Sequence, residues 1–278
     1  MVKIQGTTDY TLSKELFANG LYFEHYKNPS STETIVLIHG FLSSAFSFRK
    51  LIPYLAEQYS IVTIDLPPFG KSGKSSSYIY SHENHARAII ELLEHLNLNR
   101  VILSGHSMGG QICLYVIKQA PHLASKAILL CSSGYLKKSG RALVLSSRLP
   151  FFHLYVKRWL AKSGVEKNLQ NVVYNHALID QEMVDGYMEP FLDDMIFKGL
   201  AKMIRDREGD LDSKDLQSIH IPCLLLWGEH DRVVPADVGR KLHEDLPCST
   251  LTIFKDAGHL LPEEEPEKVF SAIQEFLG

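Results

Sequence analysis

The feature that most constrains this chain is an apolar segment that runs directly into Gly105-His106-Ser107-Met108-Gly109. A segment with helical spacing, residues 107–120, follows, so this G-x-S-x-G pattern predicts a serine on a tight turn from a strand into a helix. Such a turn holds its side chain clear of the sheet in strained backbone geometry. We therefore predict that bulk at Gly105 or Gly109 would collide with the crossing backbone. The free N–H groups and dipole of the helix would favour negative charge beside Ser107.

Six short apolar runs, rich in β-branched residues, predict a parallel sheet. They are continuous rather than alternating, which is typical of strands buried on both faces. The runs are residues 34–38, 60–64, 100–103, 127–130, 223–227 and 250–254. Segments with helical spacing lie at residues 44–58, 81–97, 107–120, 236–246 and 265–277. This alternation predicts an α/β fold whose mostly parallel central sheet is flanked by helices, with residues 8–13 and 20–27 as an antiparallel edge.

Residues 133–218 interrupt the alternation. They contain no strand-like run, many aromatic residues, and four of the six methionines of the chain. We interpret them as a helical cap inserted into a core formed by residues 1–132 and 219–278. Because methionine fills irregular apolar space, we predict that Trp159, Met183 and Met188 contact substrate. The alternative is that these side chains only fill the interior of a small helical layer.

The same segment is divided by charge. Between residues 135 and 168, eight bases face one acid, Glu166, whereas between residues 180 and 215 eleven acids face five bases. The eight bases are Lys137, Lys138, Arg141, Arg148, Lys157, Arg158, Lys162 and Lys167. The favoured interpretation is that two solvated faces of opposite charge attract each other. A basic surface that touches a membrane or guides an anionic substrate is the alternative.

Composition restricts the partners of the chain. The formal net charge is −3, so the protein has no global basic field and nucleic acid is not an expected partner. The longest apolar runs are far too short to span a bilayer, so stable membrane insertion is not expected. Residues 1–6 open no apolar leader segment, and the four cysteines are too widely spaced for a disulfide framework. These features predict a cytoplasmic protein, but they do not determine its oligomeric state.

Other predicted strands end in residues that could activate a serine. Gly40 after the first run lets the backbone turn inward, so the Phe41 N–H could face a developing oxyanion together with the Met108 N–H. Asp231 follows the strand at residues 223–227, and His259 follows the strand at residues 250–254. Their order along the chain, Ser-Asp-His, is not that of chymotrypsin or subtilisin.

Glu229, two residues before Asp231, is a second candidate for the carboxylate that pairs with His259. The strand at residues 127–130 ends in Cys131-Ser132-Ser133-Gly134, which offers no carboxylate at that alternative place. Asp231 is therefore the predicted partner of His259.

Together these segments resemble the α/β-hydrolase superfamily, near its cap-bearing esterases and carbon–carbon-bond hydrolases. The matching residues are His39-Gly40, Gly105-His106-Ser107-Met108-Gly109-Gly110, Gly228-Glu229-His230-Asp231 and Gly258-His259. Residues 65–73 are similar to the D-x-x-G-x-G loop of the family, with Pro68 in place of its first glycine. The resemblance covers residues 30–132 and 219–278.

The resemblance implies a role for each matching residue. Ser107 would be the nucleophile, His259 the general base, and Asp231 the group that orients the imidazole. The Phe41 and Met108 N–H groups would form the oxyanion hole. His39 would brace the loops beside it and is also a candidate for substrate contact. His106 and His230 would be packing or hydrogen-bonding neighbours.

The function that the resemblance implies is a serine hydrolase for carboxylic esters of small-to-medium apolar substrates, working through an acyl-enzyme on Ser107. It implies no metal and no organic cofactor. Three alternatives stay open: hydrolysis of a carbon–carbon bond in ring-cleavage products, perhydrolase activity with the same three residues, and a ligand receptor that keeps the three residues but turns over slowly.

Overall fold

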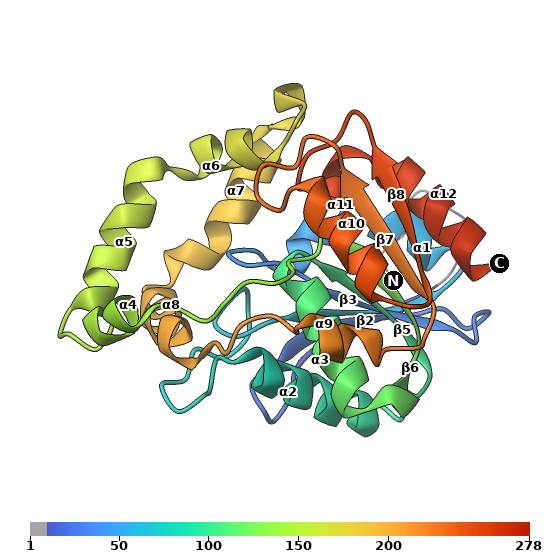
Figure 1. Cartoon of the computed structure of the whole chain (residues 1–278), viewed down its shortest axis with the longest axis horizontal. Coiled ribbons are helices and arrows are strands. Elements are labelled where there is room, and N and C mark those ends of the chain that lie inside the picture. Colours follow the sequence, from blue (N-terminus) through green and yellow to red (C-terminus); the bar gives the residue numbers. More distant parts are fainter. Residues whose placement is uncertain (1–9) are drawn as a thin grey trace.

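The computed structural model describes residues 10–278 around one eight-stranded sheet (Figure 1). Across the sheet the strand order is β1-β2-β4-β3-β5-β6-β7-β8. The β1–β2 and β2–β4 pairs are antiparallel, and every other pair is parallel. The strands are β1 (Thr11–Leu16), β2 (Tyr22–Lys27), β3 (Thr34–Ile38), β4 (Ser60–Asp65), β5 (Val101–His106), β6 (Ala124–Leu130), β7 (Cys223–Gly228) and β8 (Ser249–Phe254). The predicted fold class is confirmed.

All six apolar runs are strands. Every residue of β4, β5 and β7 is buried, which explains why these runs are apolar without alternation. The antiparallel edge is present, but its first strand is displaced from residues 8–13. It pairs with β2 from Thr11–Lys27 to Leu16–Tyr22, so it continues to Leu16. The first two residues of the predicted segment lie outside the described residues, as does the predicted absence of a leader in residues 1–6.

Helices cover both faces of the sheet (Figure 1). The helices α1 (Ile52–Ala56) and α12 (Pro266–Leu277) pack against each other. On the opposite face α2 (His82–His95) packs against α3 (Met108–Gln119), and α3 contacts β3, β5 and β6. The helix α10 (Ala236–Asp245) contacts β7 and β8. Short helical turns complete this part of the chain: η1 (Ala45–Phe48), η2 (Pro121–Leu123) and α11 (Leu261–Glu264).

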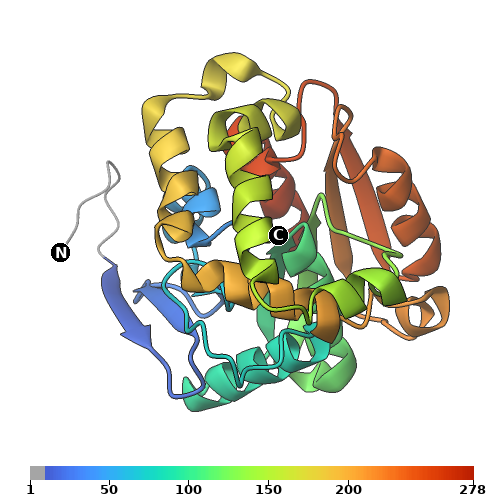
Figure 2. The same ribbon diagram turned by 90° about the vertical axis from the view of Figure 1, so that its left-hand side faces the viewer.

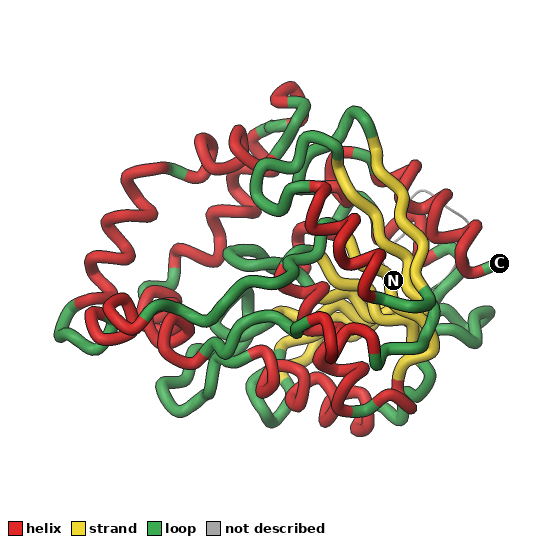
Figure 3. The backbone as a smooth tube through the Cα atoms, viewed as in Figure 1, coloured by secondary structure: helices red, strands yellow, loops and turns green. Residues whose placement is uncertain are grey.

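Residues 133–218, called the helical segment below, contain helices and no strand, as predicted (Figure 3). Its helices are α4 (Arg141–Ser146), α5 (Phe152–Ser163), α6 (Val165–Val172), η3 (His176–Leu178), α7 (Gln181–Met188), η4 (Glu189–Leu192), α8 (Met195–Asp206) and α9 (Ser213–Gln217). The helices α4 to α8 stand to one side of the sheet (Figures 1 and 2). The helices α5 and α8 pack together, and Lys157 of α5 forms an ion pair of 2.6 Å with Asp194.

No helix within residues 10–278 has both the length and the apolar character that a bilayer-spanning helix requires.

Candidate active site

Ser107 occupies the predicted turn between β5 and α3. Its φ of 53° and ψ of −120° are rare for a residue with a side chain. A Cβ atom at Gly105 would lie 2.3 Å from the carbonyl oxygen of Gly109, and one at Gly109 would lie 2.1 Å from that of Ile38. The prediction that bulk at either glycine would collide with the backbone is confirmed.

Two backbone N–H groups adjoin this serine. Met108 is the first residue of α3, so its N–H has no acceptor within the helix. A Cβ atom on Gly40 would lie 3.0 Å from the Cβ of Ser107, so the loop that carries Phe41 runs directly beside the serine. This is where an oxyanion hole is expected, and the assignment of Phe41 and Met108 to that role stays a prediction.

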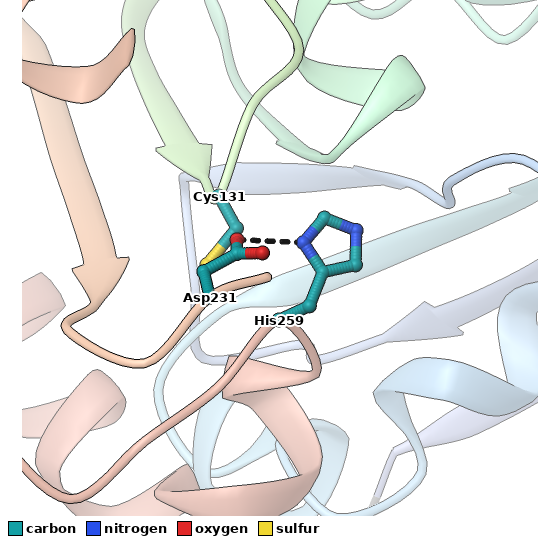
Figure 4. Close-up of side chains that lie close together, drawn as sticks. All are labelled: Cys131, Asp231 and His259. Carbon is teal, nitrogen blue, oxygen red and sulfur yellow. Dashed lines mark hydrogen bonds and ion pairs between the residues drawn. The ribbon is translucent and has the colours of Figure 1, made fainter. Parts of the chain in front are cut away.

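Asp231 and His259 form a buried pair at the ends of β7 and β8 (Figure 4). The imidazole Nδ1 and Asp231 Oδ2 are 2.7 Å apart. The other carboxylate oxygen accepts the Val233 and Val234 N–H groups, each at 2.8 Å. Glu229 is exposed to solvent, so the structure joins Asp231 rather than Glu229 to the imidazole.

The loops that carry Asp231 and His259 come into close backbone contact at Gly228 and Gly258. A Cβ atom on Gly228 would lie 2.1 Å from the carbonyl oxygen of Gly258, which is adjacent to His259. Only a residue without a side chain at position 228 permits this approach of the two loops that carry Asp231 and His259.

Ser107 and His259 line the same cavity. Within the described part of the chain, no hydrogen bond joins the Ser107 hydroxyl to the imidazole, although Nδ1 is occupied by Asp231 and Nε2 is left for the serine. Catalytic hydrogen bonds are often long in unliganded enzymes and shorten when substrate binds. That Ser107, His259 and Asp231 act together stays a prediction.

His106 packs against His259. Its Nε2–H donates to the carbonyl oxygen of His259 at 2.7 Å, and the two rings are 4.8 Å apart. Burial, followed by the neighbouring His259, lowers the pKa of His106 to about 3. His106 therefore stays neutral and does not repel a positive charge on His259. His230 stacks on Tyr174 at 4.1 Å.

Cys131 is a neighbour of the pair that the sequence analysis did not assign. Its Sγ lies with ligand atoms of Asp231 and His259 inside a span of 4.8 Å (Figure 4). Burial, and then the Asp231 carboxylate, raise the pKa of the thiol, and its proton is directed at the carbonyl oxygen of Gly258 at 3.7 Å. A protonated thiol is a poor metal ligand, and Asp231 and His259 already bind each other, so these residues fit an acid–base pair better than a metal centre. The sequence feature that could have pointed to Cys131 is its position directly after β6, at the edge of the sheet where the candidate site lies.

His39 braces the loops from the interior. Its Nδ1–H donates to the Gly40 carbonyl at 2.7 Å, and its Nε2 accepts the Leu66 N–H at 2.8 Å. Asp65 holds the same region, because it accepts the N–H groups of Ala45 at 2.7 Å and Lys71 at 2.8 Å. His39 is fully buried and does not line the cavity, so the structure gives it the bracing position and not the one of substrate contact.

The cavity has a volume of about 370 Å³ and is lined mainly by apolar side chains. Trp159 lines it, whereas Met183 and Met188 do not, and the contact of Trp159 with substrate stays a prediction. Met183 is completely buried in a small apolar cluster with Leu169 and Tyr187, and Met188 is partly exposed. Lining residues that the sequence analysis missed include Leu42, Leu160, Tyr187, Phe191, Val233 and Leu260. The positions of Leu160, Tyr187 and Phe191 depend on how the helical segment folds over the sheet, which no motif encodes. Leu42, Val233 and Leu260 instead lie on the loops that follow β3, β7 and β8.

Comparisons with known proteins agree with this geometry. A family model described as alpha/beta hydrolase fold matches residues 33–266. An uncharacterized hydrolase of Bacillus subtilis (strain 168), YugF, is 53% identical over 257 residues, which cover 92% of this chain and 94% of the relative.

Two solved structures share the architecture. A thermophilic esterase from Thermogutta terrifontis matches with a TM-score of 0.76 at 21% identity, over 96% of this chain and 98% of that one. A meta-cleavage product hydrolase from Pseudomonas fluorescens IP01 matches with a TM-score of 0.77 at 18% identity, over 95% of this chain and 97% of that one. The turn that carries Ser107, the eight-stranded sheet and the family match lead to one conclusion: this chain is a hydrolase that belongs to the α/β-hydrolase fold family.

Proposed function

We propose that this protein is a serine hydrolase that cleaves carboxylic esters with a small-to-medium apolar part, through an acyl-enzyme on Ser107. One observation carries the proposal: the buried Asp231–His259 hydrogen bond opens onto the same apolar cavity as Ser107 on its strained turn.

The chemistry follows from these positions. His259 Nε2 takes the proton of Ser107 as its oxygen attacks the ester carbonyl, and Asp231 stabilises the resulting imidazolium. The Phe41 and Met108 N–H groups bind the tetrahedral oxyanion, and one such donor is typically worth about 2.7–4 kcal/mol in the transition state. The imidazolium then protonates the departing alkoxide. A water molecule releases the acid from Ser107 by the same steps.

The lining of the cavity supports an uncharged apolar substrate. No Lys, Arg, Asp or Glu is found among the described residues that line it. Ring-cleavage products carry a carboxylate, and burying that charge without a cationic partner is costly. The cavity therefore favours an ester over the carbon–carbon-bond alternative. We further propose that the helical segment acts as a cap, because it supplies Trp159, Leu160, Tyr187 and Phe191 to the lining.

The test is a panel of p-nitrophenyl esters of increasing acyl length, with wild type and Ser107→Ala. The variant should fold normally and lose at least about 10⁴-fold in kcat, because the hydroxyl is the reacting group. Ser76→Ala, at an exposed loop position, is the matched control and should keep full activity. Unchanged cleavage by Ser107→Ala would remove the proposed nucleophile.

A second measurement separates the enzyme from a receptor. An organophosphate should label Ser107 alone, as peptide mapping can establish, and wild type should turn over esters continuously. A ligand that raises the melting temperature of wild type without continuous turnover would favour the receptor alternative.

A further inference from the structure

The helix α5 presents large apolar side chains to solvent. Tyr155 and Trp159 are each 64% exposed, and their spacing of four residues places them in one stripe of α5, while Phe151, the left-handed residue that precedes the helix, is 72% exposed. Leu145, in α4, and Leu149, between α4 and α5, are 68% and 63% exposed. The outward face of a helix in a globular protein is normally polar, so this face requires an explanation. The helix α5 lies at the outer side of the molecule (Figures 1 and 2).

Cations border this aromatic stripe. Arg158 and Lys162 are exposed one turn apart on the same outward face of α5, and Arg148 is exposed just before it. Among the described residues, Lys157 is the one base between residues 135 and 168 that forms an ion pair, with Asp194. The attraction that we expected between the basic residues 135–168 and the acidic residues 180–215 therefore appears as one ion pair, Lys157–Asp194. The other bases of this stretch retain charge for an external partner.

We propose that the α4–α5 surface, defined by Leu145, Leu149, Phe151, Tyr155, Trp159 and the adjoining cations, docks on an anionic phospholipid membrane. Aromatic side chains beside Lys and Arg, with almost no acid, are typical of helices that lie in the bilayer interface. The cations would bind lipid phosphates while the aromatic rings enter the headgroup region. A second copy of this chain fits the surface poorly, because two such basic faces would repel each other.

The docking surface continues into the candidate active site. Trp159 belongs both to the exposed stripe and to the lining of the cavity that holds Ser107. Docking would place the cavity beside the lipid phase, where apolar esters partition. This consequence rests on the proposed function, but the docking itself does not, and Ser107→Ala should bind membranes as wild type does.

Vesicle binding tests the proposal. Vesicles of phosphatidylcholine mixed with phosphatidylglycerol should co-sediment the protein at low ionic strength, and vesicles of phosphatidylcholine alone should co-sediment far less of it. Salt near 1 M, where the Debye length is about 3 Å, should weaken the binding. Tryptophan fluorescence gives a second readout, because Trp227 is completely buried and a blue shift on binding would come from Trp159.

Two double variants locate the surface. Arg158→Gln with Lys162→Gln should lower the affinity for anionic vesicles roughly tenfold or more, and Phe151→Ser with Tyr155→Ser should abolish the blue shift. Lys27→Gln with Lys255→Gln removes the same charge from other exposed positions and should change neither readout. All of these variants should cleave a short water-soluble ester normally.

Three results would overturn the proposal: no preference for anionic vesicles, equal losses in the control variant, or self-association in sedimentation equilibrium that the Phe151/Tyr155 variant abolishes without any vesicle binding. The last result would identify the surface as an interface between copies.

Discussion

The sheet core and the helical segment are built by different means. In the core, the candidate catalytic residues are held where backbone segments cross: Gly109 against Ile38, and Gly228 against Gly258. In the helical segment, Met183, Leu169 and Tyr187 pack through their side chains, and several large apolar side chains remain exposed. A side chain at a backbone crossing must displace the backbone that it meets, whereas a site packed by side chains tolerates many substitutions. If the proposed function holds, we expect the chemistry to depend on the core and the choice of substrate to depend on the helical segment.

The largest expected effect is on kcat, and it tests whether the core and the helical segment have these different roles. Asp231→Asn should lower kcat by about 10⁴-fold, because the imidazole loses its correct tautomer and the charge that stabilises its protonated form. Trp159→Ala, in the helical segment, should instead raise KM roughly tenfold and leave kcat nearly unchanged. Steady-state kinetics on one apolar ester measures both variants.

Glu229→Gln is the control for Asp231→Asn, because the exposed neighbour should be dispensable. A large loss of kcat in Trp159→Ala, or none in Asp231→Asn, would break the comparison.

A smaller effect on stability tests the backbone crossings. Gly109→Ala places a Cβ atom 2.1 Å from the Ile38 carbonyl oxygen, and it should cost at least about 3 kcal/mol in the free energy of unfolding. Gly140→Ala, before α4, meets no atom within 4 Å and should change that free energy by less than about 1 kcal/mol. Urea unfolding compares the two variants, and equal costs would show that the helical segment is packed as tightly as the core.

The smallest expected effect concerns how the free energy of unfolding changes as the pH falls. Burial lowers the pKa values of His82, His85 and His106, all outside the helical segment, to about 3. Because unfolding restores a pKa near 6.5, their contribution to stability is complete above about pH 6.5 and is lost as the pH falls toward 3. Each histidine adds up to about 1.4 kcal/mol per pH unit to that slope.

The variant His85→Gln should therefore reduce the pH dependence of the unfolding free energy between about pH 6 and pH 5 by nearly one proton. His85 accepts a hydrogen bond from the Tyr78 hydroxyl at 3.0 Å, so the variant could also lower stability at neutral pH, but only the slope reports the buried titration. His176→Gln, in the exposed part of the helical segment, provides the matched comparison. An unaltered slope in His85→Gln would contradict the assignment.

Local sequence was sufficient for much of the core. The continuous apolar runs predicted all six of their strands, because a strand buried on both faces needs no alternation. The glycines around Ser107 predicted the turn, because close backbone approach leaves a direct mark on residue type. The edge strand β1 was displaced by three residues because its register depends on pairing with β2, and a mixed edge pattern does not specify that register.

The order of Ser107, Asp231 and His259 after β5, β7 and β8 was therefore readable from the sequence alone, since parallel strands bring their carboxyl ends to one edge of the sheet. Only the tertiary structure decided that Asp231 rather than Glu229 meets the imidazole, that His39 braces a loop, and that Met183 is buried away from the cavity. These outcomes depend on which way a side chain points and on what packs against it from distant parts of the chain. Such contacts leave no pattern in the neighbouring residues, because many combinations of apolar side chains can fill the same space.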